Sequence, residues 1–223
     1  MYKEEDLDIA ELDRRIAKFE ARASEHESAG GASRETALLI LIAAAVGMLA
    51  SAMLILSELS YVKNPAGHLV CDINPLFGCS TWFTAWQGHL LLGTPNALWG
   101  ALFFAGMTAL GFVLALGGRL PRLLWQGALA GSSLGIVWVM WFAYESFAVE
   151  GSLCPYCLLV WLATIPLFLT LLGRAAQAGH LGQSAQAFGS AMVRNRWVIL
   201  GGTYFALGLF TVVWFWDAWA LVF

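Results

Sequence analysis

Two of the four cysteines form a Cys-x-x-Cys motif, Cys154-Pro155-Tyr156-Cys157, at the start of an apolar stretch. Pro155 is typical of the first turn of a helix. Residues three apart share one helical face, with Cβ atoms about 5–6 Å apart, so a disulfide between them needs only modest adjustment. The positive end of the helix dipole also favours a thiolate. We expect a reactive dithiol; a structural disulfide is the alternative, although closing so short a loop gains little chain entropy.

The other two cysteines, Cys71 and Cys79, flank the segment DINPLFG. Asp, Asn, Pro and Gly favour turns, so this segment can fold back and join its ends. A disulfide that only staples the loop is one interpretation of this pair. A second dithiol involved in exchange with the first is the other.

Membrane-spanning helices must position these cysteines. The chain has 223 residues, of which 59% are hydrophobic and only 12% charged, about half the charge of an average soluble domain. Its net charge of −3 argues against nucleic acid as a partner. About 20 apolar residues cross a hydrocarbon core, and nothing alternates with the period of a strand. We predict an all-α integral membrane protein whose five helices lie within the uncharged windows 36–57, 90–118, 123–144, 151–173 and 197–216. In the second window, Gly93-Thr94-Pro95 predicts a helix that starts at about Pro95.

Lys and Arg are distributed unevenly among the connecting segments. Eleven of the twelve lie before the first window or in the segments that follow the second and fourth, whereas Lys63 lies alone on the opposite side. Positively charged loops stay in the cytoplasm. We therefore predict a cytoplasmic N-terminus, with the C-terminus and all four cysteines extracytoplasmic, where disulfides can persist.

These boundaries divide the chain into four parts. They are a cytoplasmic extension (1–35), a four-helix bundle (36–173) with an outer loop (59–93), a loose cytoplasmic loop (174–196), and a fifth transmembrane helix with a short outer tail (197–223). In the extension, Leu12, Ile16 and Phe19 share one helical face, which predicts a solvated helix against the bundle. A helix on the lipid surface is the alternative, which the acidic residues of the extension disfavour.

Two dithiols on one side of a membrane can form a relay, in which a thiolate of one pair attacks the disulfide of the other. Zinc is a rival use of four thiols, and His68 and His89 lie nearby. We predict no metal site, because one ligand pair would begin a membrane helix, and we expect both histidines to be interfacial. Glu58 and Glu145, at the ends of spans, are expected to be solvated, with Glu145 a minor candidate for proton relay.

The cysteine pattern resembles that of the vitamin K epoxide reductase (VKOR) family over roughly Ala37–Gly173. Three motifs carry the resemblance, in this order: Cys71-x7-Cys79 followed by Ser80, then Pro95-Asn96 opening a span, then Cys154-x-x-Cys157 opening another. The fifth span and the acidic extension are similar to a bacterial, actinobacterial-like branch. We expect no fused thioredoxin-like domain, so the resemblance implies a separate partner protein.

The resemblance also implies roles for individual residues. Cys71 would meet the partner's thiol and Cys79 would attack Cys154, while Cys157 would face a quinone. Ser80 and Asn96 match positions that hydrogen-bond quinone carbonyls. One departure is Trp161, which stands where animal members carry Tyr and offers only an N–H donor, so epoxide reduction is not implied.

A quinone needs an apolar, aromatic pocket with few donors. Five aromatic residues near the outer surface could line one: Trp82, Phe83, Trp99, Phe103 and Trp161. The alternative for each is the aromatic belt that gathers at membrane interfaces. The segment 80–92 is predicted to be a half-helix on the surface, covering the pocket.

The function predicted from the sequence is a membrane thiol oxidoreductase. It would reoxidise an extracytoplasmic thioredoxin-fold (DsbA-like) protein and pass two electrons to a quinone of menaquinone or ubiquinone type, with menaquinone favoured by the resemblance. The bilayer is the other partner. The alternatives are a structural membrane protein or transporter stabilised by disulfides, and, less favoured, a zinc site.

Overall fold

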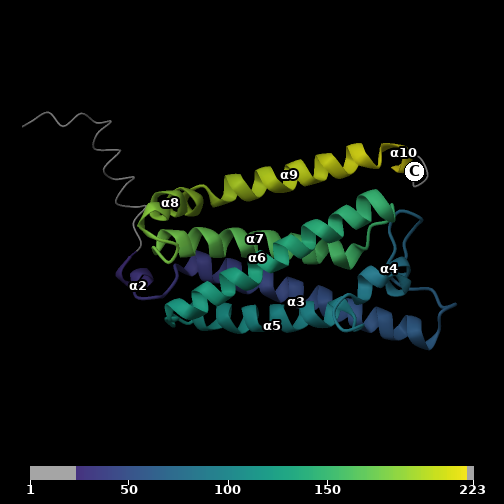
Figure 1. Cartoon of the computed structure of the whole chain (residues 1–223), viewed down its shortest axis with the longest axis horizontal. Coiled ribbons are helices and arrows are strands. Elements are labelled where there is room, and N and C mark those ends of the chain that lie inside the picture. The colour runs from purple at the N-terminus through teal and green to yellow at the C-terminus, as the bar shows by residue number, and fades with distance from the viewer. Residues whose placement is uncertain (1–23, 220–223) are drawn as a thin grey trace, which may run out of the picture.

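The computed structural model describes residues 24–219 of the chain as an elongated helical bundle (Figure 1). Its elements, in chain order, are α2 (Glu25–Ser28), α3 (Arg34–Lys63), α4 (Ser80–Thr84), η1 (Trp86–His89), α5 (Asn96–Ala115), α6 (Arg122–Tyr144), η2 (Glu145–Val149), α7 (Pro155–Gln177), η3 (Gln183–Ala185), α8 (Gln186–Arg194), α9 (Arg196–Trp214) and α10 (Trp216–Trp219). The predicted helix through Leu12, Ile16 and Phe19, and the tail after residue 219, lie outside the described residues.

Five helices are long and apolar enough to cross a membrane: α3, α5, α6 continued by η2, α7 and α9. The prediction of an all-α protein with five transmembrane helices is confirmed. The element η2 is a π-helix, which continues α6 with a wider turn.

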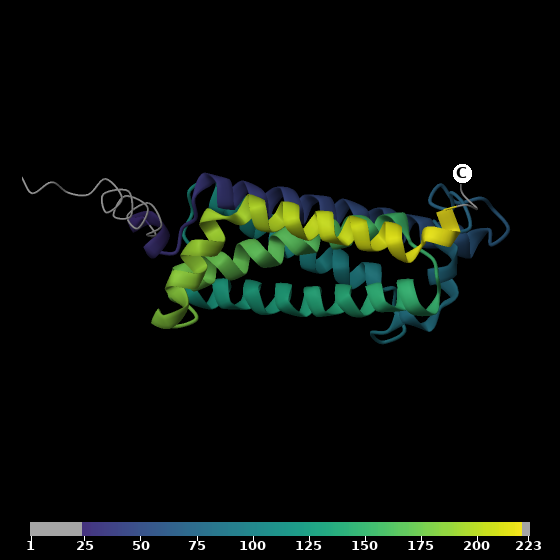
Figure 2. The ribbon, with the colours of Figure 1, turned by 90° about the horizontal axis from the view of Figure 1, so that it is seen from above.

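Helix α3 packs against α5 and α7, and α7 packs in turn against α6. Close approach of α3 and α5 depends on glycine. A Cβ atom on Gly111 would lie 2.8 Å from the backbone of Leu41, and one on Gly47 would overlap the ring of Phe104. Small residues allow such tight contacts in a membrane, where helices associate through packing. Helix α9 runs along the outside of the bundle and contacts chiefly α7 (Figure 2).

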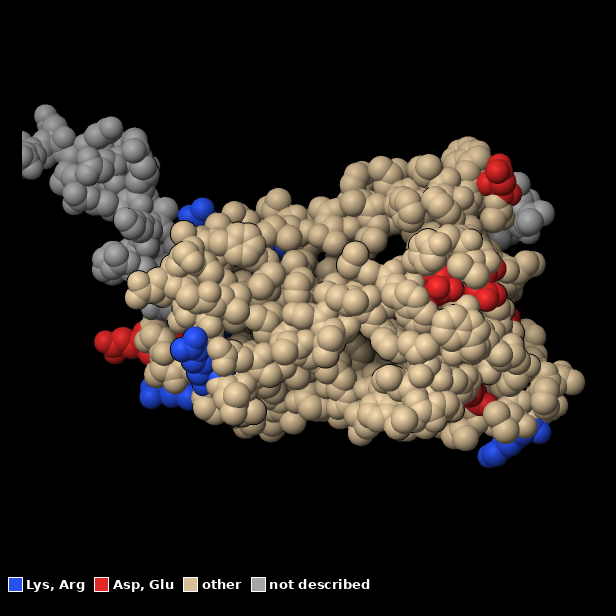
Figure 3. Space-filling model, viewed as in Figure 1, with Lys and Arg blue, Asp and Glu red and all other residues tan. Residues whose placement is uncertain are grey.

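Charged side chains gather at the two ends of the molecule and leave an uncharged band between them (Figure 3). One end, which we call the cysteine end, carries α4, η1 and the four cysteines (Figure 1). The opposite end carries α2 and α8 (Figure 1). This division matches the helix boundaries, because Arg34, Arg122 and Arg196 each begin a long helix at the opposite end.

Two segments differ from the sequence-based expectation. The region 174–196 is not a loose loop, because α7 continues to Gln177 and α8 packs against it so closely that a Cβ atom on Gly189 would lie 2.2 Å from the backbone nitrogen of Gln177. Helix α3 continues to Lys63, beyond the predicted start of the outer loop at 59, and ends at Asn64 because Pro65 follows.

Candidate active site

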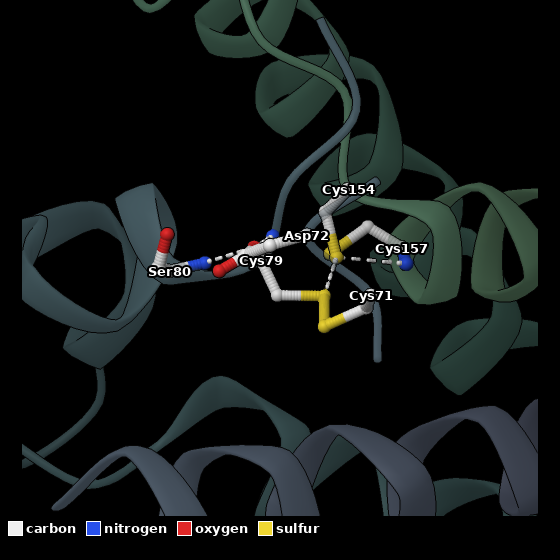
Figure 4. The surroundings of a disulfide bond; sticks show 6 residues. All are labelled: Cys71, Asp72, Cys79, Ser80, Cys154 and Cys157. Carbon is white, nitrogen blue, oxygen red and sulfur yellow. Dashed lines mark hydrogen bonds between the residues drawn. A yellow bond between two sulfur atoms is a disulfide. The ribbon is translucent and has the colours of Figure 1, made fainter. Parts of the chain in front are cut away.

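Cys71 and Cys79 form a disulfide with a Cα–Cα distance of 5.8 Å (Figure 4). The loop between them folds back because the Asn74 side chain accepts hydrogen bonds from two backbone N–H groups, those of Leu76 and Phe77, both at 2.9 Å. Asp72 Oδ1 accepts the backbone N–H groups of Cys79 at 2.6 Å and Ser80 at 3.1 Å, where α4 begins. The turn-forming residues thus set the position of Cys79 as well as closing the loop.

A short backbone bridge joins this loop to the segment before α7. Phe77 and Leu153 form an isolated parallel β-bridge. The N–H of Gly78 donates to the carbonyl of Leu153 at 3.0 Å, and the N–H of Leu153 donates to the carbonyl of Leu76 at 2.8 Å. Since Cys79 follows the bridge on one side and Cys154 follows it on the other, the bridge brings the two cysteine pairs together.

Cys154 is the N-cap residue of α7, and its Sγ atom accepts a hydrogen bond from the backbone N–H of Cys157 at 3.3 Å. Pro155 occupies the first turn, as the sequence predicts. The thiol of Cys154 lies 3.6 Å from Sγ of Cys79. Figure 4 shows the resulting line of sulfur atoms, which runs from Cys71 through Cys79 and Cys154 toward Cys157.

The sulfur atoms are shielded from solvent. Cys71, Cys79 and Cys154 are buried, and Cys157 is half-buried. Burial raises the pKa of Cys154, but hydrogen bonds from the thiol and backbone of Cys157 and from the backbone of Tyr156 outweigh it, so that this pKa lies below the ordinary value for cysteine. Cys154 is therefore deprotonated to the thiolate more readily than an ordinary cysteine, as expected at a helix N-terminus.

A cavity of about 370 Å³ lies among α3, α4, α5, α6 and α7, next to Cys157. All five aromatic residues selected from the sequence line it: Trp82, Phe83, Trp99, Phe103 and Trp161. Its volume falls within the range of pockets that bind small molecules, and apolar side chains dominate its wall. The line of sulfur atoms therefore ends at an apolar, aromatic cavity.

The segment predicted as a half-helix over the pocket is two short helices, α4 and η1, because Ala85 between them is extended, with ψ at 140°. Side chains from two spans hold η1. Glu58 pairs with His89 at 2.8 Å, and Glu145 accepts a hydrogen bond from Gln87 at 3.2 Å. The expectation that both glutamates are solvated is wrong, since Glu145 is buried and Glu58 lines the cavity. Each instead bonds to a polar side chain of η1.

The two residues matched to quinone-carbonyl positions are placed differently from each other. Asn96 lines the cavity, but its amide donates to the carbonyl of Gln87 at 2.5 Å and accepts from the N–H of Leu90 at 3.2 Å. Ser80 is not among the residues that line the cavity. Its backbone N–H donates to Asp72 at the start of α4, and Figure 4 shows its hydroxyl pointing away from the sulfur atoms.

Two features of the site were missed from the sequence. Ser51 lines the cavity, although a serine within an apolar helix carries no signal of binding. Phe147 contacts Trp161 and Phe215, at ring-centroid distances of 6.3 and 5.2 Å, and so joins α9 to the site. Aromatic residues near a membrane surface are too common to indicate such a contact.

Within residues 24–219, no three His, Cys, Asp or Glu side chains cluster in a way that could hold a metal ion.

The site consists of a disulfide in contact with a Cys-x-x-Cys thiol, beside an apolar cavity in a helical membrane bundle. This arrangement is suited to thiol–disulfide exchange. A sequence profile of the Vitamin K epoxide reductase family matches residues 38–172, which is more than half of the chain. The chain belongs to this family of quinone-using thiol oxidoreductases, as the motifs predict. The match covers α3 to α7 and leaves α9 outside. No curated protein matches the chain.

Proposed function

We propose that the protein oxidises the dithiol of an extracytoplasmic thioredoxin-fold (DsbA-like) protein and passes the two electrons to a membrane quinone. The observation that carries this proposal is the 3.6 Å contact between Sγ of Cys79 and Sγ of Cys154, with Cys157 next in line at the cavity. A disulfide that only stabilises a loop has no need of a second dithiol at this distance. Supporting disulfide formation in secreted proteins is the biological role that follows.

Electrons and protons are conserved in each exchange step. The partner's dithiol gives two electrons and two protons to the Cys71–Cys79 disulfide, which becomes a dithiol while the partner gains a disulfide. Cys79 then attacks Cys154 of an oxidised Cys154–Cys157 pair, and Cys157 leaves as a thiolate. Cys71 resolves the Cys79–Cys154 bond, which restores the loop disulfide. The reduced Cys154–Cys157 pair finally passes two electrons and two protons to the quinone and returns to a disulfide.

The loop pair is the side that would meet the partner. Two apolar side chains flank Cys71 and are exposed, Val70 at 87% and Ile73 at 66%. They offer an apolar surface beside the disulfide for a partner to cover. Because the sulfur atoms themselves are buried, we expect docking of the partner to open the loop before its thiol reaches Cys71.

The cavity suits a quinone, which supplies a two-electron acceptor when bound. Its wall is mostly aromatic and aliphatic, and Cys157 lies in that wall. Aromatic side chains such as Trp161 and Phe103 can stack on a flat ring. Menaquinone is the favoured acceptor, given the actinobacterial-like resemblance.

We place the cysteine end outside the cell. The described Lys and Arg residues other than Lys63 lie in segments that the positive-inside rule assigns to the cytoplasm. This orientation puts both cysteine pairs in an oxidising compartment, where a secreted partner can reach them. Labelling of intact cells with a maleimide that cannot enter them, after reduction, should modify the cysteines; labelling only after lysis would contradict the orientation.

The decisive test is quinone reduction by the purified protein with a reduced thioredoxin-fold donor. Wild type should consume quinone in step with donor oxidation, and Cys157→Ala should not. A structural membrane protein predicts instead that a reductant shifts the melting temperature while no quinone is consumed. That result would replace the proposed function.

A further inference from the structure

Two buried hydrogen-bonding groups in the cavity wall have no partner. They are the hydroxyl of Ser51, on α3, and the indole N–H of Trp82, on α4. Ser51 is 1% exposed and Trp82 is 3% exposed, so water does not reach either group from the surface. A polar group left unpaired in an apolar interior costs free energy, and an unpaired donor in a cavity wall therefore points to a bound acceptor.

Ser51 differs from three other hydroxyl residues in the membrane helices. Those of Ser133, Thr108 and Thr164 each donate to the carbonyl four residues earlier in the helix, at 2.7 or 2.8 Å. This bond is the usual way in which a hydroxyl is satisfied in an apolar helix. The Ser51 hydroxyl faces α5 at Gly100, where a Cβ atom would lie 2.9 Å from its Oγ. Gly100 has no side chain to cover that hydroxyl, and both Ser51 and Gly100 line the cavity.

Several other polar side chains around the cavity are already hydrogen-bonded, whereas the indoles of Trp138 and Trp161, which also line it, are only half-buried. Asn96 binds the backbone of η1 and of Leu90, Thr164 binds the carbonyl of Val160, and Glu58 binds His89. The indole N–H of Trp99 donates to Thr94 at 2.8 Å. Among the residues that line the cavity, Ser51 and Trp82 are thus the ones with fully buried donors that have no partner.

We propose that Ser51 Oγ and Trp82 Nε1 donate hydrogen bonds to the two carbonyl oxygens of the bound quinone. This assignment rests on the proposed function and names the groups that recognise its electron acceptor. The two donors come from different walls, α3 and α4, and a quinone carries its carbonyls on opposite edges of the ring. The Trp82 ring packs on Phe142 with centroids 4.4 Å apart, and it belongs to the same buried cluster as Cys79 and Cys154.

A consequence for Asn96 follows from the same geometry. With its amide committed to the η1 segment, Asn96 positions the cover of the cavity, and Ser51 and Trp82 take the carbonyls. A donated hydrogen bond draws electron density from a carbonyl and favours its reduction, so the two donors also assist electron transfer from Cys157.

The test compares Ser51→Ala and Trp82→Phe with a matched control, Ser133→Ala. Ser133 is half-buried on α6, its hydroxyl is bonded to the carbonyl of Leu129, and it does not line the cavity. With menadione and a short-chain ubiquinone as probes, we expect KM to rise about tenfold in each of the two cavity variants, the usual scale for one lost hydrogen bond. Ser133→Ala should keep the KM of wild type, and Ser51→Thr, which retains a hydroxyl, should restore it.

Two further measurements separate ligand contact from structural damage. The infrared carbonyl band of bound menadione should move to higher frequency in Ser51→Ala and Trp82→Phe, because a hydrogen bond weakens the C=O bond. Single-turnover oxidation of the reduced donor by the Cys71–Cys79 disulfide, which needs no quinone, should keep its wild-type rate. Unchanged KM and carbonyl bands in a wild type that does reduce quinone would overturn the assignment alone, whereas a wild type that reduces no quinone would overturn the proposed function with it.

Discussion

Sγ of Cys79 lies 3.6 Å from Sγ of Cys154, although 75 residues separate them in the chain. This distance is a van der Waals contact between two sulfur atoms, one already in a disulfide and the other a thiol. Exchange between the pairs therefore needs only a small approach of the attacking sulfur. The same Cys79–Cys154 bond forms in either direction of exchange, so the contact identifies the intermediate without fixing the direction.

The first prediction is that this intermediate can be trapped. In a Cys71→Ser, Cys157→Ser double variant, the two resolving thiols are absent, and mild oxidation should join Cys79 to Cys154. Mass spectrometry of peptides under non-reducing conditions measures the bond. The matched control, Cys79→Ser with Cys157→Ser, leaves Cys71 and Cys154 and should cross-link far less. Equal cross-linking in the two variants would show that the contact does not direct exchange.

The second prediction concerns pH. The pKa of Cys154 is lowered mainly by hydrogen bonds from Cys157 that outweigh burial, and the charge of Asp72 raises it. A lowered pKa means that the thiolate is present at a lower pH than for an ordinary cysteine, and that activity falls only as the pH drops through this lower value. Asp72→Asn removes the charge but keeps an oxygen that can accept the N–H groups of Cys79 and Ser80. It should lower the pKa of Cys154 further.

The measurement for this second prediction is the ultraviolet absorbance of the thiolate against pH, in a background with Cys71→Ser and Cys79→Ser. Cys157→Ala in that background should move the titration to higher pH, because Cys154 loses the hydrogen bond from the Cys157 thiol. If the midpoint of the titration stays at the wild-type pH in both Asp72→Asn and Cys157→Ala, these groups do not set the pKa of Cys154.

Much of the fold follows from the sequence because charge in a membrane protein is confined to helix ends. The uncharged windows locate α3, α5, α6, α7 and α9, since each must be long enough to cross the bilayer. Helix α8 could not be located in this way. Its composition carries no transmembrane signal, and it is held by close packing of Gly189 on α7, a contact that no local pattern encodes.

The candidate site was also predictable only in part. The cysteine spacing and the turn residues around Cys79 indicate a relay, because both are local patterns. The bridge between Phe77 and Leu153 has no such pattern, since it joins single residues far apart in the chain. Ser51 was missed for a related reason. Whether a serine bonds to its own helix or faces a cavity depends on the neighbouring helix, and here on Gly100.

The third prediction tests what Asn96 does. Its side chain makes two hydrogen bonds to the segment that covers the cavity, to Gln87 and to Leu90. Asn96→Ala removes both, each worth about 0.5–1.5 kcal/mol, and should loosen that segment. Hydrogen–deuterium exchange of the backbone at 86–92 should become faster, and KM for quinone should rise. Asn96→Asp retains the acceptor for Leu90 and should protect that amide; unchanged exchange in Asn96→Ala would remove the argument that this residue holds the cover.

The fourth prediction concerns the end of α9, which lies outside the family match. Phe215, just after α9, is 6% exposed and belongs to a buried cluster with Leu76 and Leu153. These two residues form part of the backbone bridge that aligns the cysteine pairs. The indole of Trp214 also donates to the carbonyl of Phe147 at 3.0 Å, which fixes α9 to η2. Phe215 therefore braces the bridge from outside.

Phe215→Ala should slow transfer between the two cysteine pairs, by about tenfold if the bridge loosens by roughly 1.4 kcal/mol. Dithiothreitol, a small dithiol that can reduce the Cys154–Cys157 pair without the loop, should still support near-normal quinone reduction, because the cavity is not lined by Phe215. Phe205→Ala is the matched control, since Phe205 lies on the same helix and is 73% exposed. A loss of both activities in Phe215→Ala would indicate general unfolding of the bundle. A loss of neither would mean that the bridge keeps Cys79 and Cys154 in contact without help from the fifth span.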